Sequence, residues 1–300
     1  MKGFRLFAVM LPLCSVFCET GAASAVSPEV FFEMIAENDR VGVMSAVIGG
    51  FDLNVYDMTS GSTPLMHAIR KARPGMVEIL LDSGADVNLN DFKNADGISP
   101  LMLAVMSATA PASPNMTPER RRGAMGIFDM LIGRRAEINY MEPNGMTALS
   151  WALSGMDRES CEIVVSKLLE AGADVNPPVP PQKWSPLMWA VGNAYLRELE
   201  TGEDHTGLIK LMLDAGADPD VKADGNTPLH AVAFIEREIT AGVPKTSLPP
   251  GYSSRIGPGI ARMLLDAGAD KNAINDEGKT PLEVALENRN FKIAALLAAR

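Results

Sequence analysis

The chain contains little of what an enzyme or a metal protein would need. Of its 300 residues, only three are histidine and three are cysteine. The sequence has no G-x-S-x-G segment, no G-x-x-x-x-G-K-S/T phosphate loop, no H-E-x-x-H and no C-x-x-C. These absences exclude the common signatures of nucleophilic hydrolases, phosphate loops and zinc sites. They predict a non-catalytic protein without a cofactor or a metal.

Clustered positive charge is also scarce. The formal net charge is −10, and the only basic run is Arg120-Arg121-Arg122. Binding to a phosphate backbone needs clustered Lys and Arg, so the composition argues against a nucleic-acid partner. With 47% apolar and 21% charged residues, the chain instead has the composition of a folded protein with a large core.

The apolar run near the N-terminus is too short to cross a bilayer comfortably. Lys2 and Arg5 precede this run, which extends over residues 6–17, and the small residues Ala23-Ser24-Ala25 follow it. A basic segment, a short apolar segment and an A-x-A site predict a secretory signal peptide over residues 1–25, cleaved after Ala25. The alternative is an uncleaved anchor helix.

Cleavage would leave an exported chain with a single cysteine. Removal of Lys2, Arg5 and Glu19 would change the formal charge from −10 to −11. Cys161 could then form no internal disulfide, and its place in an amphipathic helical pattern favours a packing residue over a reactive thiol. We expect the mature chain in the periplasm, with secretion from the cell as the second alternative and no stable membrane insertion.

What the sequence does contain is an internal repeat. Short apolar stretches end in a segment close to Gly-Ala-Asp-Val-Asn in residues 80–88, 168–176, 212–220 and 264–272, and more weakly in 131–139 and 48–54. A second segment, close to Thr-Pro-Leu, begins at Thr63, Ser99, Thr147, Ser185, Thr227 and Thr280. Self-similarity at this spacing is typical of a solenoid protein.

Each of these segments predicts one end of a helix. Thr or Ser before Pro is a helix start, because the hydroxyl caps free N–H groups and Pro suits the first helical position. A glycine follows the second apolar stretch of four repeats, where a left-handed C-cap favours a residue without Cβ: Gly84, Gly172, Gly216 and Gly268. Each repeat is therefore predicted to be a turn, a helix, a second helix and a capped exit.

This pattern resembles the ankyrin repeat, whose consensus is D-x-x-G-x-T-P-L-H-x-A-A … L-L-x-x-G-A-D-V-N. The resemblance covers residues 28–300 and implies an all-α solenoid of about seven stacked helix pairs in a single domain, 26–300. The implied units are an N-terminal cap (28–54), repeats 55–88, 89–139, 140–176, 177–220 and 221–272, and a C-terminal cap (273–300). It further implies a non-catalytic scaffold that binds a protein partner. We expect a monomer.

The chain departs from the family in length between the two helices. The family has 25 residues between the capping Thr or Ser and the closing Asn or Asp, as from Thr63 to Asn88, but the next four intervals are 40, 29, 35 and 45 residues. The intervals from each closing residue to the next cap stay between 7 and 11 residues. The insertions therefore lie on one edge of the solenoid, where they are either part of a binding face or tolerated decoration.

Three local expectations follow from these departures. Residues 107–122 and 240–259 are rich in Pro, Gly and Ser and are predicted to be ordered or semi-ordered loops. Arg134-Arg135 stands where other repeats have Ser-Gly or Ala-Gly, which predicts a strained or shifted cap. His205 lies in an acidic insertion and is predicted to be in a solvated loop.

The resemblance also assigns residues to the concave surface. Four residues after the capping Thr or Ser, the family side chain points into that surface, and Trp184 belongs to the same side. The predicted protein-binding patch is His67, Leu103, Trp151, Trp184 and Trp189. The competing interpretation is ordinary packing of these residues against the next helix. His230 occupies the family's TPLH position, where the imidazole ties adjacent repeats together.

Three other functions stay open at this point. A secreted effector that binds host-cell proteins would use the same surface, and a small-ligand or carbohydrate binder would use the tryptophans. A hidden hydrolase would have its site in the long loops.

Overall fold

The computed structural model describes residues 26–91, 97–178, 180, 184–241 and 254–299, and within 236–241 only the backbone. This part of the chain is almost entirely helical, with two isolated antiparallel bridges, Met141 to Thr147 and Ala223 to Asn226, and no strand. No helix in it is long and apolar enough to cross a membrane.

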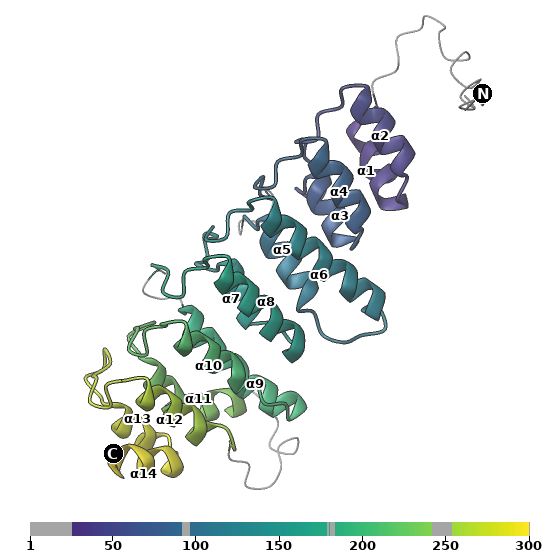
Figure 1. Cartoon of the computed structure of the whole chain (residues 1–300). Helices are drawn as coiled ribbons and strands as arrows, with labels where there is room; N and C mark the ends of the chain where they lie inside the picture. The colour runs from purple at the N-terminus through teal and green to yellow at the C-terminus, as the bar shows by residue number, and fades with distance from the viewer. Residues whose placement is uncertain (1–25, 92–96, 179, 181–183, 242–253, 300) are drawn as a thin grey trace, which may run out of the picture.

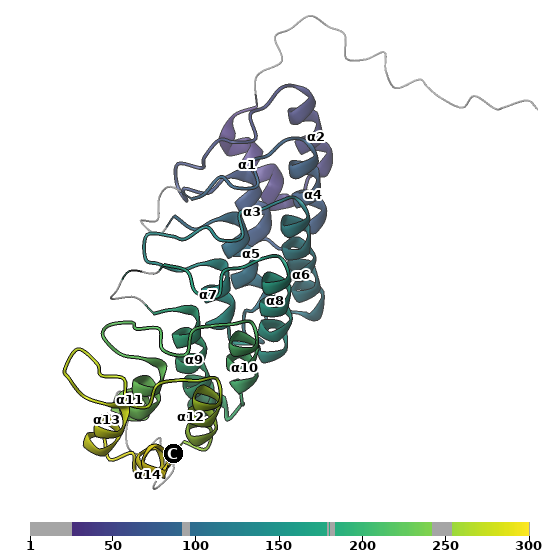
Figure 2. The ribbon, with the colours of Figure 1, turned by 60° about the vertical axis from the view of Figure 1, so that its left-hand side comes forward.

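The helices form seven pairs stacked along one axis (Figure 1). The pairs are α1 (Pro28–Glu37) with α2 (Arg40–Ile48), α3 (Pro64–Arg70) with α4 (Pro74–Asp82), α5 (Pro100–Ala108) with α6 (Pro118–Gly133), α7 (Ala148–Leu153) with α8 (Arg158–Glu170), α9 (Pro186–Thr201) with α10 (Thr206–Asp214), α11 (Pro228–Ala241) with α12 (Gly257–Asp266), and α13 (Pro281–Glu287) with α14 (Phe291–Ala299). The first helices of the pairs make one layer and the second helices the other (Figure 2). The predicted all-α solenoid is therefore confirmed.

The helix ends have the cap geometry that the repeated residues favour. Thr63 Oγ1 accepts a hydrogen bond from the N–H of Met66 at 3.2 Å, and Ser99, Thr147, Ser185 and Thr280 cap their helices in the same way. The four exit glycines have φ between +89° and +99°. In its repeat, Arg135 occupies the position of the exit glycine and has φ +62°. This conformation is unfavourable for any residue that has a Cβ atom.

Polar side chains join each repeat to the next along the projecting turns. The side-chain oxygen of each closing Asn or Asp accepts a hydrogen bond from a backbone N–H two positions before the closing residue of the following repeat. These bonds, 2.8–2.9 Å long, run from Asp86 to Asn54, from Glu137 to Asn88, from Asp174 to Asn139, from Asp218 to Asn176 and from Asp270 to Asp220. We call this set the Asn ladder. It explains why the Asn or Asp recurs even where the rest of the segment has diverged.

Small residues let the first helices approach one another. The fifth residue after the cap is an alanine in five repeats, and all five are completely buried: Ala68, Ala104, Ala152, Ala190 and Ala285. The second helices are amphipathic instead, and α4 buries one face through Met76, Val77, Leu80 and Leu81. One continuous core thus runs between the two layers.

The insertions extend helices more than the sequence suggests. Residues 107–122 were expected as a loop, but 107–108 belong to α5 and 118–122 to α6. The reason is a second helix start within the insertion, because Thr117 Oγ1 caps the N–H of Arg120 at 3.2 Å and Pro118 occupies the first helical position. Of the segment 240–259, residues 242–253 lie outside the described residues.

Arg121 fixes the insertion between α5 and α6. Its guanidinium donates to the carbonyls of Ala108 and Ala110, at 3.2 and 3.1 Å, within the same repeat. It also donates to Ser160 Oγ of the next repeat at 3.0 Å and lies 3.4 Å from a carboxylate oxygen of Asp157. The insertion is therefore attached to its neighbour by a charged side chain.

The extension of α9 anchors the end of the longest insertion, the one between α11 and α12. Glu198 is buried, and its carboxylate accepts hydrogen bonds from Ser254 Oγ at 2.6 Å and from the N–H of Arg255 at 2.8 Å. A buried carboxylate needs such partners to offset its desolvation. The last turns of α9 thus hold the chain directly before α12.

The Asn ladder predicts that two chemically identical substitutions lower the free energy of unfolding by unequal amounts. Asn176 accepts from the N–H of Asp218 and donates to the carbonyl of Gly216 at 3.0 Å, whereas Asn272 closes the last repeat with no ladder bond of its own. We expect Asn176→Ala to lower the free energy of unfolding by about 1–2 kcal/mol, because two inter-repeat bonds are lost. Asn272→Ala is the control and should change it by less than about 0.5 kcal/mol. Equal losses in urea unfolding would contradict the role of the ladder.

Candidate protein-binding site

Two tryptophans of the predicted patch lie side by side at the start of α9. The ring centroids of Trp184 and Trp189 are 5.3 Å apart with an interplanar angle of 56°, and both side chains are partly exposed. They border a pocket of about 380 Å³, lined by Ser154, Trp184, Trp189, Gly192, Asn193, Leu196 and Ile235. We call it the Trp pocket. It lies between the end of α7, the middle of α9 and α11.

Local sequence explains how α9 forms this pocket. Trp189, Gly192, Asn193 and Leu196 are spaced so that they share one face of the helix. Gly192 makes room for the neighbouring indole, because a Cβ there would lie 2.4 Å from Cζ3 of Trp184. Trp184 can therefore lie directly against the helix backbone.

The walls of the pocket are held in place by polar contacts with α7. The side-chain amide of Asn193 donates to the carbonyl oxygens of Leu153 and Gly155, both at 2.9 Å. Ser154 Oγ donates to the carbonyl of Trp151 at 3.0 Å. These donors are used within the chain, so what the pocket offers a ligand is mainly apolar surface. Leu196 contributes to it with 37% of its surface exposed.

The structure does not gather the whole predicted patch into one site. Trp151 lies on α7 but is not among the lining residues of the Trp pocket, and its Nε1 is buried with no hydrogen-bond partner among the described residues. Leu103 is only 5% exposed and borders a different pocket, beside α6. His67 borders a third, near the end of α3. Only Trp184 and Trp189 come together.

Sequence reasoning missed the residues that complete the pocket. Leu196 and Asn193 lie seven and four positions after Trp189, on the part of α9 that extends beyond the seven-residue length of α3 and α13. Helical periodicity continued from Trp189 would have found both. Ile235, on α11, could not be found in this way because it reaches the pocket only through stacking of the next repeat.

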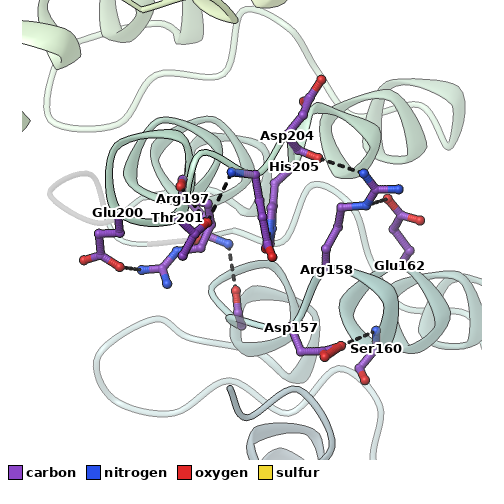
Figure 3. Close-up of polar contacts among 12 residues, drawn as sticks. Asp157, Arg158, Ser160, Glu162, Arg197, Glu200, Thr201, Asp204 and His205 are labelled. Atoms are coloured by element: carbon purple, nitrogen blue, oxygen red, sulfur yellow. Dashed lines mark hydrogen bonds and ion pairs between the residues drawn. The ribbon is translucent and has the colours of Figure 1, made fainter. Parts of the chain in front are cut away.

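His205 is buried, and the prediction of a solvated loop is wrong. Helix α9 continues to Thr201, and Gly202 then turns the chain with φ +74°. His205 follows with 0% exposure, between Arg197 of α9 and Arg158 of α8, and its Nε2 lies 3.3 Å from Glu203 Oε2 (Figure 3). The acidic segment is a tight inter-helix turn rather than a loop.

His230 joins two repeats, as its position in the pattern implies. Its Nε2 lies 2.9 Å from the carbonyl oxygen of Lys279 in the following repeat, and its Nδ1 lies 2.8 Å from Thr227 Oγ1. Because a carbonyl can only accept, Nε2 carries the proton and Nδ1 accepts. The neutral imidazole therefore satisfies both contacts.

Groups that could perform chemistry are sparse in the described structure. No group of three or more His, Cys, Asp or Glu among the described residues could hold a metal ion. Cys161 is completely buried in α8, and burial raises the pKa of its thiol to about 12. It packs in the core.

Fold and pockets together define a helical-repeat solenoid with pockets beside its first helices. Family models for ankyrin repeats match residues 31–110, described as "Ankyrin repeats (3 copies)", and residues 144–178, described as "Ankyrin repeat". The chain therefore contains ankyrin repeats. Such repeats are typically non-catalytic modules for protein–protein interaction.

Individual proteins share this architecture. The chain is 29% identical over 215 residues to neurogenic locus notch homolog protein 1 of Xenopus tropicalis, covering 71% of this chain and 7% of that protein. It is 34% identical over 128 residues to human ankyrin repeat and SOCS box protein 6, covering 42% of this chain and 27% of that protein. These matches span only a small part of the relatives' length. The crystal structure of the ankyrin repeat domain of Bcl-3 superposes with a TM-score of 0.62 at 23% identity, covering 89% of this chain and 97% of that one.

The buried histidines predict loss of stability in mild acid. Burial lowers the pKa of His205 and of His230, so below about pH 6.5 the unfolded chain binds more protons than the folded one. The free energy of unfolding should therefore fall as the pH decreases from 6.5 towards the lower folded-state pKa values.

Urea unfolding at pH 7.5 and 5.5 measures this effect. His230→Met is the informative variant, because Met66, Met102 and Met188 occupy the corresponding position in other repeats. The variant should be less stable at pH 7.5, where it loses the bond to Lys279, but should lose less on acidification than the wild type. An unchanged or higher wild-type stability at pH 5.5 would contradict the prediction.

Burial also predicts that Cys161 is unreactive in the folded protein. With its pKa raised to about 12, the thiol has little thiolate at neutral pH and no access to reagents. A maleimide should label it slowly under native conditions and completely in denaturant. Rapid stoichiometric labelling of Cys161 itself in the native protein would show that this part of α8 opens readily.

Proposed function

We propose that the protein is an exported, non-catalytic scaffold, monomeric in itself, that binds a protein partner through the Trp pocket. The observation that carries the proposal is the pair Trp184 and Trp189, partly exposed in an apolar pocket beside the exposed Leu196. Partly buried aromatic residues around a pocket are typical anchors of protein interfaces, each worth about 2 kcal/mol or more at a hot spot. The inter-helix insertions would add specificity at one edge.

Polar groups in the pocket favour an apolar partner side chain over a sugar. A carbohydrate needs several free hydrogen-bonding groups beside the aromatic rings. In the Trp pocket, Asn193 donates both amide hydrogens to carbonyls at and just after the end of α7, and Ser154 donates to a carbonyl, so neither side chain has a hydrogen left to donate to a sugar. This supports an aliphatic or aromatic side chain of a protein as the occupant.

Export is supported by the N-terminal sequence alone, which lies outside the described residues. Lys2 and Arg5, the apolar run 6–17 and the A-x-A site at 23–25 are the features of a cleaved signal peptide. We propose the periplasm as the location; release from the cell as an effector is the alternative. Fractionation of source cells decides between them, because a periplasmic protein is retained with the envelope and an effector appears in the medium.

Substitutions in the Trp pocket test the binding proposal. We expect Trp189→Ala and Leu196→Ser each to weaken capture of a partner from the envelope fraction of source cells by about tenfold or more, because each removes apolar contact area. Leu286→Ser is the matched control: Leu286 is 50% exposed on α13 and lines none of the described pockets named above.

Circular dichroism should be unchanged in all three variants, which separates loss of binding from loss of folding. If Leu286→Ser reduces capture as much as Leu196→Ser, the Trp pocket is not the binding site.

A further inference from the structure

A second pocket, of about 430 Å³, lies at the C-terminal end of α3. It is lined by Ser60, Ser62, His67, Arg70, Lys71 and Arg120. We call it the basic pocket. Residues 60 and 62 belong to the turn before α3, and Arg120 comes from the first turn of α6, so the pocket joins two repeats.

The basic pocket is a local excess of positive charge in an acidic chain. Two carboxylates face it. Asp91 lies 3.5 Å from Arg70 Nη2, and Asp57 accepts hydrogen bonds from Ser60 Oγ at 2.6 Å and from the N–H of Thr59. Lys71 and Arg120 have no carboxylate partner among the described residues. Among the described residues, the guanidinium of Arg120 donates only to a backbone carbonyl, that of Arg70, at 3.2 Å.

Two polar atoms at this pocket are buried without a partner. Ser62 has 0% exposure, and its hydroxyl makes no hydrogen bond within the described structure. Nε2 of His67 is likewise buried and unpaired. A buried donor without a partner costs about 1–3 kcal/mol, so such groups are rare unless a ligand or water satisfies them. Together, the hydroxyl of Ser62, the imidazole of His67 and the two cations without a carboxylate partner form a set of donors for an oxyanion.

An apolar pocket of about 370 Å³ adjoins the basic pocket. It shares Arg70 and Arg120 with it and is otherwise lined mainly by apolar residues, among them Leu103, Met106 and Met116. A ligand that fills both pockets must therefore carry an anionic group next to an apolar one. A protein segment in which Glu or Asp alternates with Leu has both, whereas a free phosphate would leave the apolar pocket empty.

We propose that the basic pocket binds a side-chain carboxylate of an acidic protein segment whose neighbouring apolar side chain enters the adjoining pocket. This inference rests on the proposed function as a protein-binding scaffold, but it concerns a surface that shares no lining residue with the Trp pocket. It assigns the partner an acidic, apolar segment. It also gives Leu103 and His67 of the predicted patch a role separate from that of the tryptophans.

Fluorescence anisotropy with the full folded chain tests the proposal. The probe is a labelled peptide of alternating Leu and Glu, and the comparison peptide has Gln in place of every Glu. The Glu peptide should bind saturably and the Gln peptide at least about tenfold more weakly, because the charge-assisted contacts are lost. Inorganic phosphate should not bind more tightly than the Glu peptide.

Variants on α6 provide a control matched in charge. Arg120→Gln and Lys71→Gln should each weaken the Glu peptide about fivefold to tenfold. Arg122→Gln removes the same charge from the same helix, but Arg122 lines neither pocket, so binding should change little. The side chain of Lys71 is exposed and makes no hydrogen bond or ion pair among the described residues, so its substitution keeps the test valid if loss of the Arg120 bond disturbs folding.

The outcomes separate this inference from the proposed function. Trp189→Ala should leave binding of the Glu peptide intact. No saturable binding of the Glu peptide, equal binding of both peptides, an equal effect of Arg122→Gln, or binding of phosphate alone would each overturn the inference. None of these results bears on capture through the Trp pocket.

Discussion

The hydrogen bonds of the Asn ladder set the spacing of the whole solenoid. Each joins a side-chain oxygen of one repeat to a backbone N–H of the next, as from Asp86 to Asn54. The ladder therefore fixes the position of the projecting turns relative to one another. Extra residues on that edge would put its bonds out of register, and the intervals there stay between 7 and 11 residues. The opposite edge, where the two helices of a repeat meet, has no such ladder among the described residues, and the insertions lie there.

This asymmetry gives the irregular repeats their pockets. Extra length between α9 and α10 is used to extend α9 to Thr201 rather than to form a loop. The extension carries Leu196 to the edge of the Trp pocket and buries Glu198, which anchors the chain before α12. Extra length before α6 likewise brings Arg120 over the end of α3. Both pockets thus depend on residues that a repeat of regular length would not contain.

The sequence predicts local features well and tertiary ones poorly. N-caps such as Thr63 and C-terminal glycines such as Gly84 can be recognised in the sequence, because their geometry depends on neighbours within a few residues. The same local logic, applied to Thr117, would have corrected the loop expected at 107–122. Burial of His205 could not be read in this way, because it results from packing between α8 and α9. The proximity of Trp184 and Trp189 could be predicted from their positions relative to the capping Ser185. The separation of Trp151 from their pocket could not, because it depends on how α7 and α9 stack.

The closing Asn and Asp residues of the ladder are paired, whereas some buried polar atoms near the first helices are not. Along the ladder, each described closing Asn or Asp that precedes another repeat has its oxygen paired within the chain, as Asn88 has with Glu137. Near the first helices, Ser62 Oγ, Nε2 of His67 and Nε1 of Trp151 are buried without a partner among the described residues. An unmet donor lowers the stability of the isolated chain, and a partner that supplies an acceptor recovers that free energy on binding.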